Sequence, residues 1–339
     1  RRQSRRIRRG LIWAVSSILV ALLPAAVAHA YPEGSFARLG FGQLNDLAYS
    51  PDGQTLAVAT NNGLELWDPA TRGRTALYDT VDWLTSVAYS PDGSMLAAGS
   101  RDGTVKLWDM ASGTEMEPLR GGEGWVLAVA FSPDGITLAS GNGDGVARIW
   151  DAKAGVAVAA LSVLATSLAF SPDGATLAIG RADGAVDLWD VALAARVVSL
   201  GSGPDIRSLV FSPDGTTVAS GSEDGVVRLW DIASGIDVAV LRTAGIAGAV
   251  NYVAFSPDGS TLASGYNRGA VILWDVRTRT AISTRQAGNS RVTTVAFSPD
   301  GATLAHANGA GRIGLLDATT GATLTAFRNN TPPVSSIAL

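Results

Sequence analysis

The sequence predicts an all-β protein made of seven copies of one four-stranded antiparallel unit. Every copy shows the same order of short apolar runs and turn signals. A Trp-Asp pair ends one of these runs in six of the seven copies. Each copy also contains the tetrapeptide Ser-Pro-Asp-Gly, 39 to 44 residues from the next, beginning at Ser50, Ser90, Ser132, Ser171, Ser212, Ser256 and Ser298. A repeated unit has no single privileged position, so function must depend on residues in which the copies differ.

The stretch 84–120 shows how one unit is built. Its apolar runs predict strands over 84–89, 95–100, 104–109 and 115–120, separated by Ser-Pro-Asp-Gly, Asp-Gly and Ser-Gly turn signals. In Ser-Pro-Asp-Gly the proline presets φ for the first corner of a type I turn. The glycine accepts the left-handed conformation that closes a bulged hairpin. Each unit is therefore expected to be a four-stranded meander.

The second strands favour sheets that are covered on both faces. They read Leu-Ala-Ser-Gly at 138–141 and 262–265, without alternation of polar and apolar residues. Small residues let neighbouring sheets approach closely, and the tryptophan of the third strand would fill the space between them. Each such tryptophan hides roughly 150–250 Å², which stabilises by about 4–6 kcal/mol as an upper bound. Sheets packed face to face around an axis make a β-propeller.

The third strands carry the signature of a known family. Residues 44–327 resemble the WD-repeat family of β-propellers, because six third strands end in Trp-Asp and the seventh ends in Leu316-Asp317. The resemblance implies the propeller fold and a face that commonly binds protein partners, and it says little more about function. The tryptophans of the structural repeat are Trp67, Trp108, Trp150, Trp189, Trp230 and Trp274.

Members of that family often have a Gly-His pair before the first strand. Its histidine joins a turn aspartate, a second-strand Ser or Thr and the tryptophan in a buried network. No unit of this chain has that histidine. We therefore expect a turn-capping role for the aspartates of four second hairpins, which are Asp102, Asp144, Asp183 and Asp224.

Residues 1–30 predict an export signal of bacterial style. Six of the first nine residues are arginine, an uncharged stretch runs from 10 to 28, and Ala28-His29-Ala30 supplies the small-x-small pattern of a cleavage site. The uncharged stretch is near the length of a membrane span, so an uncleaved anchor helix is the alternative. In either case we expect residues 31–339 to form one exported propeller domain, periplasmic, cell-surface or secreted.

Two short segments bear on the number of blades. Residues 35–39 resemble an outer strand, and residues 334–339 resemble the start of an inner strand. Family propellers close by pairing an N-terminal outer strand with the last C-terminal strands. An eight-bladed ring, with two strands lost beyond Leu339, would use both segments, whereas seven blades account for every complete unit. We predict seven blades.

Charge and cysteine content exclude several classes of function. Without residues 1–30 the chain has 20 basic and 30 acidic side chains, a formal charge of −10, which argues against a nucleic-acid partner. The chain has no cysteine, so it forms no disulfide or thiolate site. We expect a monomer stabilised by burial.

The loops that precede the first strands, and the turns between second and third strands, open on one face of the ring and differ most between copies. Aromatic and arginine residues around such a rim suit capture of a protein partner. The predicted function is therefore a non-catalytic, exported scaffold. The candidate partner-binding residues are Trp83, Trp125, Arg207, Asn251 and Arg291.

Two other functions stay open at this point. A propeller enzyme or small-ligand binder would use side chains that line the central channel near the starts of the first strands, namely Asn45, Arg207, Asn251 and Thr293. The chain would alternatively be one module of a longer protein whose other domain carries the activity.

An enzyme finds little support in the residue types. His306 is the one histidine outside the export signal, and it occupies a second-strand position where other units have serine. We expect it to be a packed structural residue. Most acidic residues occupy repeated turns, and equivalent turns do not make one active site. No catalytic residue, metal site or cofactor is predicted.

Overall fold

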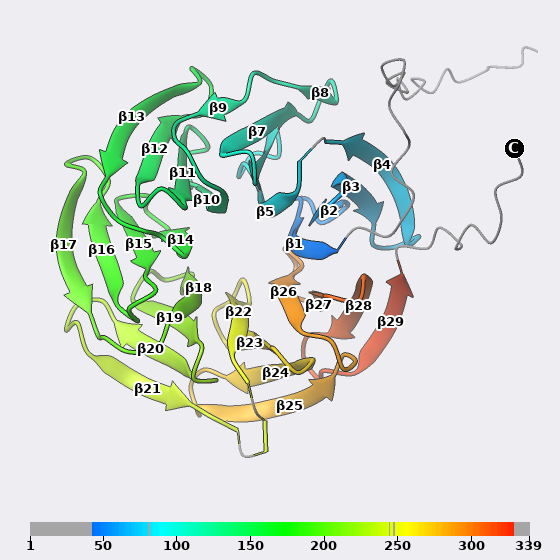
Figure 1. The fold of residues 1–339 in the computed structure, drawn as a ribbon. Helices are drawn as coiled ribbons and strands as arrows, with labels where there is room; N and C mark the ends of the chain where they lie inside the picture. The colour runs from blue at the N-terminus through cyan, green and yellow to red at the C-terminus, as the bar shows by residue number, and fades with distance from the viewer. Residues whose placement is uncertain (1–42, 81, 244, 247, 329–339) are drawn as a thin grey trace, which may run out of the picture. The chain divides into compact units, whose positions relative to one another are not determined.

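The computed structural model describes residues 43–80, 82–243, 245–246 and 248–328 of the chain. These residues form seven antiparallel sheets, or blades, arranged in a ring around a central axis (Figure 1). The blades follow one another in chain order, with the first strand of each nearest the axis and the last outermost. The predicted seven-bladed, all-β propeller is confirmed, and the eight-bladed alternative is wrong.

The strands have the following bounds. Blade 1 contains β1 (Leu44–Tyr49), β2 (Leu56–Thr60), β3 (Gly63–Asp68) and β4 (Gly73–Asp79). Blade 2 contains β5 (Leu84–Tyr89), β6 (Met95–Ser100), β7 (Thr104–Asp109), β8 (Thr114–Glu115) and β9 (Leu119–Arg120). Blade 3 contains β10 (Val126–Phe131), β11 (Thr137–Asn142), β12 (Ala147–Asp151) and β13 (Val156–Leu161). Blade 4 contains β14 (Ser167–Phe170), β15 (Thr176–Gly180), β16 (Val186–Asp190) and β17 (Ala195–Leu200).

The remaining three blades repeat the pattern. Blade 5 contains β18 (Ile206–Phe211), β19 (Thr217–Ser222), β20 (Val227–Asp231) and β21 (Asp237–Leu241). Blade 6 contains β22 (Val250–Phe255), β23 (Thr261–Tyr266), β24 (Ala270–Asp275) and β25 (Thr280–Gln286). Blade 7 contains β26 (Val292–Phe297), β27 (Thr303–Asn308), β28 (Arg312–Asp317) and β29 (Thr323–Arg328).

Blade 2 departs from the predicted meander at its outer edge. The single strand expected over 115–120 is divided into β8 and β9, both of which pair with β7. Pro118 lies between the two pieces and has no N–H to donate to the ladder, which accounts for the interruption.

The Ser-Pro-Asp-Gly turns form a second ring at one end of the blades. Their glycines have φ between 67° and 72°, as a closing left-handed residue requires. Each turn also lies against the proline of the preceding blade: a Cβ added at Gly93 would be 3.5 Å from Pro51, and one at Gly53 would be 3.3 Å from Pro299. The last contact joins the first blade to the seventh and closes the ring.

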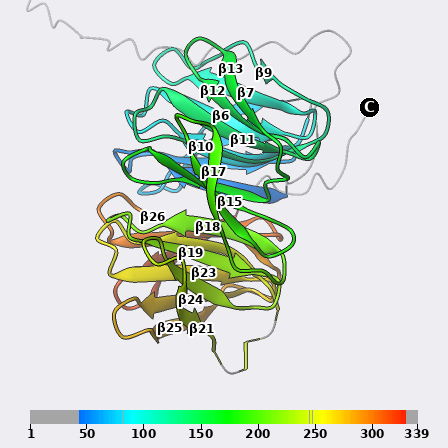
Figure 2. The same ribbon diagram turned by 90° about the vertical axis from the view of Figure 1, so that its left-hand side faces the viewer.

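The hydrophobic core consists of seven clusters, one at each junction between neighbouring blades, among the residues described. Trp108 of blade 2, for example, packs on Leu64 and Leu66 of blade 1. Trp67 of blade 1 packs on Ile313 of blade 7. The side view shows the sheets of neighbouring blades stacked face to face, as β19 and β23 are (Figure 2). The tryptophans therefore lie between blades.

Closure differs from what the family resemblance implies. Blade 7 takes all four of its described strands, β26 to β29, from one continuous segment, and so does blade 1. An outer strand from the N-terminal side is not needed to complete either sheet, because consecutive hairpins already supply every ladder. The core at Trp67 and the contact of Gly53 with Pro299 join the two blades instead.

Several predictions fall outside the described residues. These are the export signal or anchor over 1–30, the outer strand over 35–39 and the partial unit over 334–339. In the described part of the chain, no helix has the length and apolar character needed to cross a membrane.

Candidate functional site

The end of the ring opposite the Ser-Pro-Asp-Gly turns carries the residues in which the blades differ most. Here the residue before an inner strand accepts a backbone hydrogen bond from the turn that follows the second strand. Arg101 N donates to Trp83 O at 2.9 Å, Gly143 N to Trp125 O at 2.8 Å, and Gly309 N to Arg291 O at 2.9 Å. We call the residues at this position the rim; they are Gln43, Trp83, Trp125, Asp205, Ala249 and Arg291, and we include Leu164 from the loop that leads to β14 in blade 4.

Two rim tryptophans are joined by an arginine. The guanidinium carbon of Arg101 lies 3.9 Å from the ring centroid of Trp83 and 4.0 Å from that of Trp125. Both indoles are nevertheless exposed, by 37% at Trp83 and 49% at Trp125. Stacking on the planar guanidinium holds each indole ring in place, so the rings have little conformational entropy left to lose. The result is a rigid, half-exposed aromatic surface that spans blades 2 and 3.

A further exposed apolar side chain lies in the loop that leads to blade 4. Leu164, the next rim residue, is 41% exposed. Below Trp125, the inner strand β10 has the half-buried apolar side chains Leu127 and Ala128, at positions where the other inner strands have mostly polar residues. Trp83, Trp125 and Leu164, with Arg101, are called the aromatic sector below. The two indoles form a contiguous surface through Arg101, and contiguous exposed apolar groups mark interaction sites more often than isolated ones do.

Another sector of the rim, on blades 5 and 6, is polar. Arg207 donates to Oδ1 of Asn251 at 3.2 Å and pairs with Glu223 at 3.1 Å. Burial raises the pKa of Asp205; the nearby Arg207 opposes that shift and Glu223 adds to it. Two of the predicted site residues, Arg207 and Asn251, are thus brought together by a direct hydrogen bond.

Arg291 lies in a third sector, on blade 7. Its exposed side chain passes over Gly309, whose added Cβ would be 3.4 Å from Cγ of Arg291. Three of the five predicted residues therefore lie on the rim, Arg207 and Asn251 lie at the second positions of their inner strands, and the five do not form one cluster. Sequence reasoning placed Arg101 in a turn and missed its position between the tryptophans. The signal was available, because Trp83 and Trp125 occupy the same position in adjacent units and Arg101 follows the second strand between them.

The side chains proposed for a channel site mostly connect neighbouring blades. Asn45 Nδ2 donates to the carbonyl of Leu84 at 2.6 Å, and Asn251 Nδ2 donates to that of Val292 at 2.9 Å. Thr293 Oγ1 is buried, without a hydrogen-bond partner in the part of the chain described. The two asparagine contacts join β1 to β5 and β22 to β26, which is a structural role.

A buried carboxylate lies at the junction of the first and last blades. Oδ1 of Asp46 accepts from Thr294 Oγ1 of blade 7 at 2.9 Å and from Leu47 N at 2.9 Å. Its Oδ2 accepts from Ser86 Oγ at 3.1 Å and Val87 N at 3.0 Å, both in blade 2. Burial raises the pKa of Asp46, although these four hydrogen bonds oppose the shift.

Tyr252 of blade 6 lies against the same group. The Asp46 carboxylate, together with burial, raises the pKa of the Tyr252 hydroxyl. Asp46 therefore connects blades 1, 2 and 7 and contacts blade 6, and all its acceptor atoms are used within the protein. It is an interblade connection at the point of closure rather than a free acid.

The tryptophans of the structural repeat are anchored in different ways. In blades 3, 5 and 6 the indole N–H donates to the second-strand serine, at 2.9 Å for Trp150 and Ser140 and 2.8 Å for Trp274 and Ser264; Trp230 and Ser220 are joined at 2.9 Å. In blade 1 Trp67 donates to Glu65 Oε2 at 2.9 Å instead. A serine or glutamate thus replaces the histidine network of the family.

The second-hairpin aspartates accept hydrogen bonds within their own turns. Asp102 Oδ1 accepts from Thr104 N at 2.8 Å, and Asp224 Oδ1 accepts from Val226 N at 3.1 Å; Asp144 and Asp183 accept in the same way from Val146 and Ala185. Such bonds are those of turn caps. In the described ranges no group of three His, Cys, Asp or Glu side chains is arranged to hold a metal ion.

His306 is packed in the core of blade 7. It is 6% exposed and lies opposite Gly314, where an added Cβ would collide with its Nε2. The imidazole occupies the space that the small Gly314 leaves. Burial, and then the positive charge of Arg312, lower the pKa of His306 to about 4.

This shift predicts a loss of stability in acid. A histidine with a folded pKa of about 4, against 6.5 unfolded, contributes fully above pH 6.5 and loses its contribution as the pH falls through 4. Between pH 7.5 and 4, His306→Ser should therefore gain about 3 kcal/mol relative to wild type. Guanidinium unfolding of both proteins across this range measures the difference, in which all other titrations cancel. If the free energies of unfolding of the two proteins changed equally with pH, the account would be contradicted.

A ring of seven four-stranded blades with inter-blade tryptophans defines a β-propeller, and comparison with known families gives its kind. The sequence model described as WD domain, G-beta repeat matches residues 38–68, 76–109, 113–151, 161–190, 196–231 and 239–275, which is more than half of the chain. The protein therefore belongs to the WD domain, G-beta repeat family.

A second match covers the C-terminal part. Residues 282–339 match the family model described as anaphase-promoting complex subunit 4 WD40 domain. This likeness agrees with the fold of blade 7 and concerns that segment alone. A comparison with curated proteins finds no match.

Proposed function

We propose that this protein is an exported, non-catalytic scaffold that binds a protein partner through the aromatic sector of its rim. The observation that carries the proposal is the stack of Trp83, Arg101 and Trp125, in which two indoles stay 37% and 49% exposed although a guanidinium holds both. Trp and Arg are the residues most enriched at the energetic centres of interfaces. A surface fixed before binding loses little entropy when a partner docks.

The chemistry of the sector defines the kind of partner. An apolar anchor side chain would lie on the indoles and on Leu164, which is 41% exposed. Arg101 makes no ion pair with another described residue, so its guanidinium edge can accept a carboxylate. We therefore propose a partner segment with an apolar anchor beside an acidic residue. The runner-up, a ligand of the channel, is less favoured because Asn45, Asn251 and Asp46 are used between blades.

The test first identifies a partner by cross-linking the full chain in the extracytoplasmic fraction of the producing cells. It then measures the binding of the full chain to that partner. Trp83→Ala/Trp125→Ala should weaken binding about a thousandfold, since two anchors that contribute about 2 kcal/mol each together contribute about 4 kcal/mol. Leu193→Ala is the matched control, because Leu193 is 75% exposed in a turn at the Ser-Pro-Asp-Gly end. Equal binding by the double variant and wild type would refute the proposed surface.

A further inference from the structure

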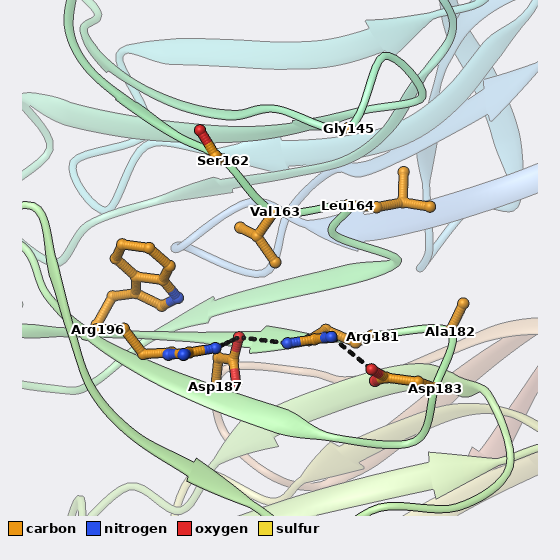
Figure 3. Close-up of a pocket in the computed structure, with 10 residues that line it drawn as sticks. Gly145, Ser162, Val163, Leu164, Arg181, Ala182, Asp183, Asp187 and Arg196 are labelled. Atoms are coloured by element: carbon orange, nitrogen blue, oxygen red, sulfur yellow. Dashed lines mark hydrogen bonds and ion pairs between the residues drawn. The ribbon is translucent and has the colours of Figure 1, made fainter.

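A cleft of about 680 Å³ opens in blade 4, beside the third strand β16 (Figure 3). Its floor contains Asp187 and Trp189 of β16, and its sides come from the turn 181–183, the loop 162–164 and Arg196 of β17. Leu164 is shared with the rim, but the other groups named lie outside the aromatic sector. We call this space the blade-4 cleft.

The charges of the cleft cancel. Oδ2 of Asp187, a residue with 0% exposure, accepts from Arg181 at 3.2 Å and from Arg196 at 3.4 Å. Arg181 also pairs with Asp183 (Figure 3). Two guanidinium groups therefore face two carboxylates, and a charged ligand would have to break an existing pair.

Two buried polar atoms in the cleft have no hydrogen-bond partner in the part of the chain that the structure describes. They are Oδ1 of Asp187, an acceptor, and Nε1 of Trp189, a donor. Each buried polar atom without a partner costs about 1–3 kcal/mol, so such atoms in native proteins call for an explanation.

Blade 1 shows how the same position is satisfied. Glu65 stands where blade 4 has Asp187, and Arg74 stands where it has Arg196. Glu65 accepts from Trp67 Nε1 at 2.9 Å through one oxygen and pairs with Arg74 at 3.4 Å through the other. The aspartate of blade 4 is one methylene shorter and leaves the indole N–H without this acceptor.

The alternative partner for the indole is also missing from blade 4. In blades 3, 5 and 6 the tryptophan donates to a second-strand serine, such as Ser140. Blade 4 has Ile179 at that position, opposite Asp187. Two separate differences, isoleucine in place of serine and aspartate in place of glutamate, thus leave one pair of buried hydrogen-bonding atoms at the cleft without partners.

We propose that the blade-4 cleft binds a neutral carboxamide, whose N–H donates to Asp187 Oδ1 and whose carbonyl accepts from Trp189 Nε1. Balanced charge excludes an ion, and one donor beside one acceptor calls for a group that does both. Asp187 and Trp189 lie two residues apart on one strand, so their side chains leave the same face of the sheet and one group with both a donor and an acceptor can bond to both. The volume exceeds that of a water, about 30 Å³, and falls among small-molecule sites.

The carboxamide has two sources, a free small amide or the Asn or Gln side chain of a peptide. The experiment follows the indole N–H signal of Trp189 by NMR in the ¹⁵N-labelled full chain, assigned with Trp189→Phe. Acetamide and the peptide acetyl-Gly-Gln-Gly-amide are the probes, and acetate is the charged control. We expect saturable shifts with both carboxamides and none with acetate. Trp230, already bonded to Ser220, should not move.

Two variants close the site in independent ways. Asp187→Glu copies blade 1, and Ile179→Ser copies blades 3, 5 and 6; each should give the indole an internal acceptor and weaken probe binding at least about tenfold. Peptide binding about tenfold tighter than acetamide assigns the site to a side chain, and equal binding assigns it to a free amide. No saturable shift in wild type, or equal shifts in either folded variant, would overturn the proposal.

Discussion

Replacing Trp108 by alanine is expected to lower the free energy of unfolding by about 3–5 kcal/mol. Trp108 has 0% exposure and fills the junction of blades 1 and 2, where its ring centroid lies 6.1 Å from that of Tyr78. The junction cannot collapse around the cavity, because β3 is paired with strands on both sides and β7 is paired with β6 from Val105 to Asp109. Equilibrium unfolding in guanidinium measures the loss.

Phenylalanine variants separate packing from hydrogen bonding. Trp108 Nε1 has no hydrogen-bond partner among the described residues, whereas Trp230 Nε1 donates to Ser220 at 2.9 Å. Trp230→Phe leaves that buried serine without its donor, so it should cost about 1 kcal/mol more than Trp108→Phe. A loss below 1 kcal/mol for Trp108→Ala would show that the inter-blade tryptophans do not determine stability.

Asp46→Ala is expected to lower the free energy of unfolding by about 3 kcal/mol and to open the ring at one junction. Four buried donors, two backbone amides and the hydroxyls of Ser86 and Thr294, lose their acceptor. Removal of the unfavourably buried carboxylate, whose pKa is raised for that reason, offsets part of the loss. Hydrogen exchange should become faster in β1 and β26, where the first and seventh blades meet.

Ser208→Ala is the matched control for Asp46. Ser208 occupies the equivalent position in blade 5 and accepts one bond, from Val253 N at 3.1 Å. Its loss should cost about 1 kcal/mol, with faster exchange confined to blades 5 and 6. If Asp46→Ala and Ser208→Ala had equal effects, Asp46 would have no special part in closure.

The repeats made the fold predictable from the sequence. Seven Ser-Pro-Asp-Gly turns and six Trp-Asp pairs place every hairpin, and local turn chemistry determines a meander whatever its neighbours are. The way in which the ring closes was harder to predict from the sequence. It depends on contacts between residues far apart in the sequence, such as Asp46 and Thr294, which no local turn pattern indicates.

The candidate site was predictable only in part. Trp83 and Trp125 were found because the copies differ there, yet their stacking on Arg101 depends on the curvature that brings blades 2 and 3 together. The blade-4 cleft was not foreseen. Its two unpaired atoms result from Ile179 and from the short side chain of Asp187, and this signal is visible only when the second and third strands of the blades are aligned.

The most direct test of the central claim is photo-cross-linking with a photoreactive phenylalanine placed at position 125 or at position 193 of the full chain. Trp125 lies in the aromatic sector, and Leu193 is a still more exposed apolar residue at the other end of the ring. The account predicts one protein adduct from position 125, competed by excess wild type and weakened by Arg101→Ala, and none from position 193. An adduct of the same protein from position 193 alone would contradict the proposed binding face.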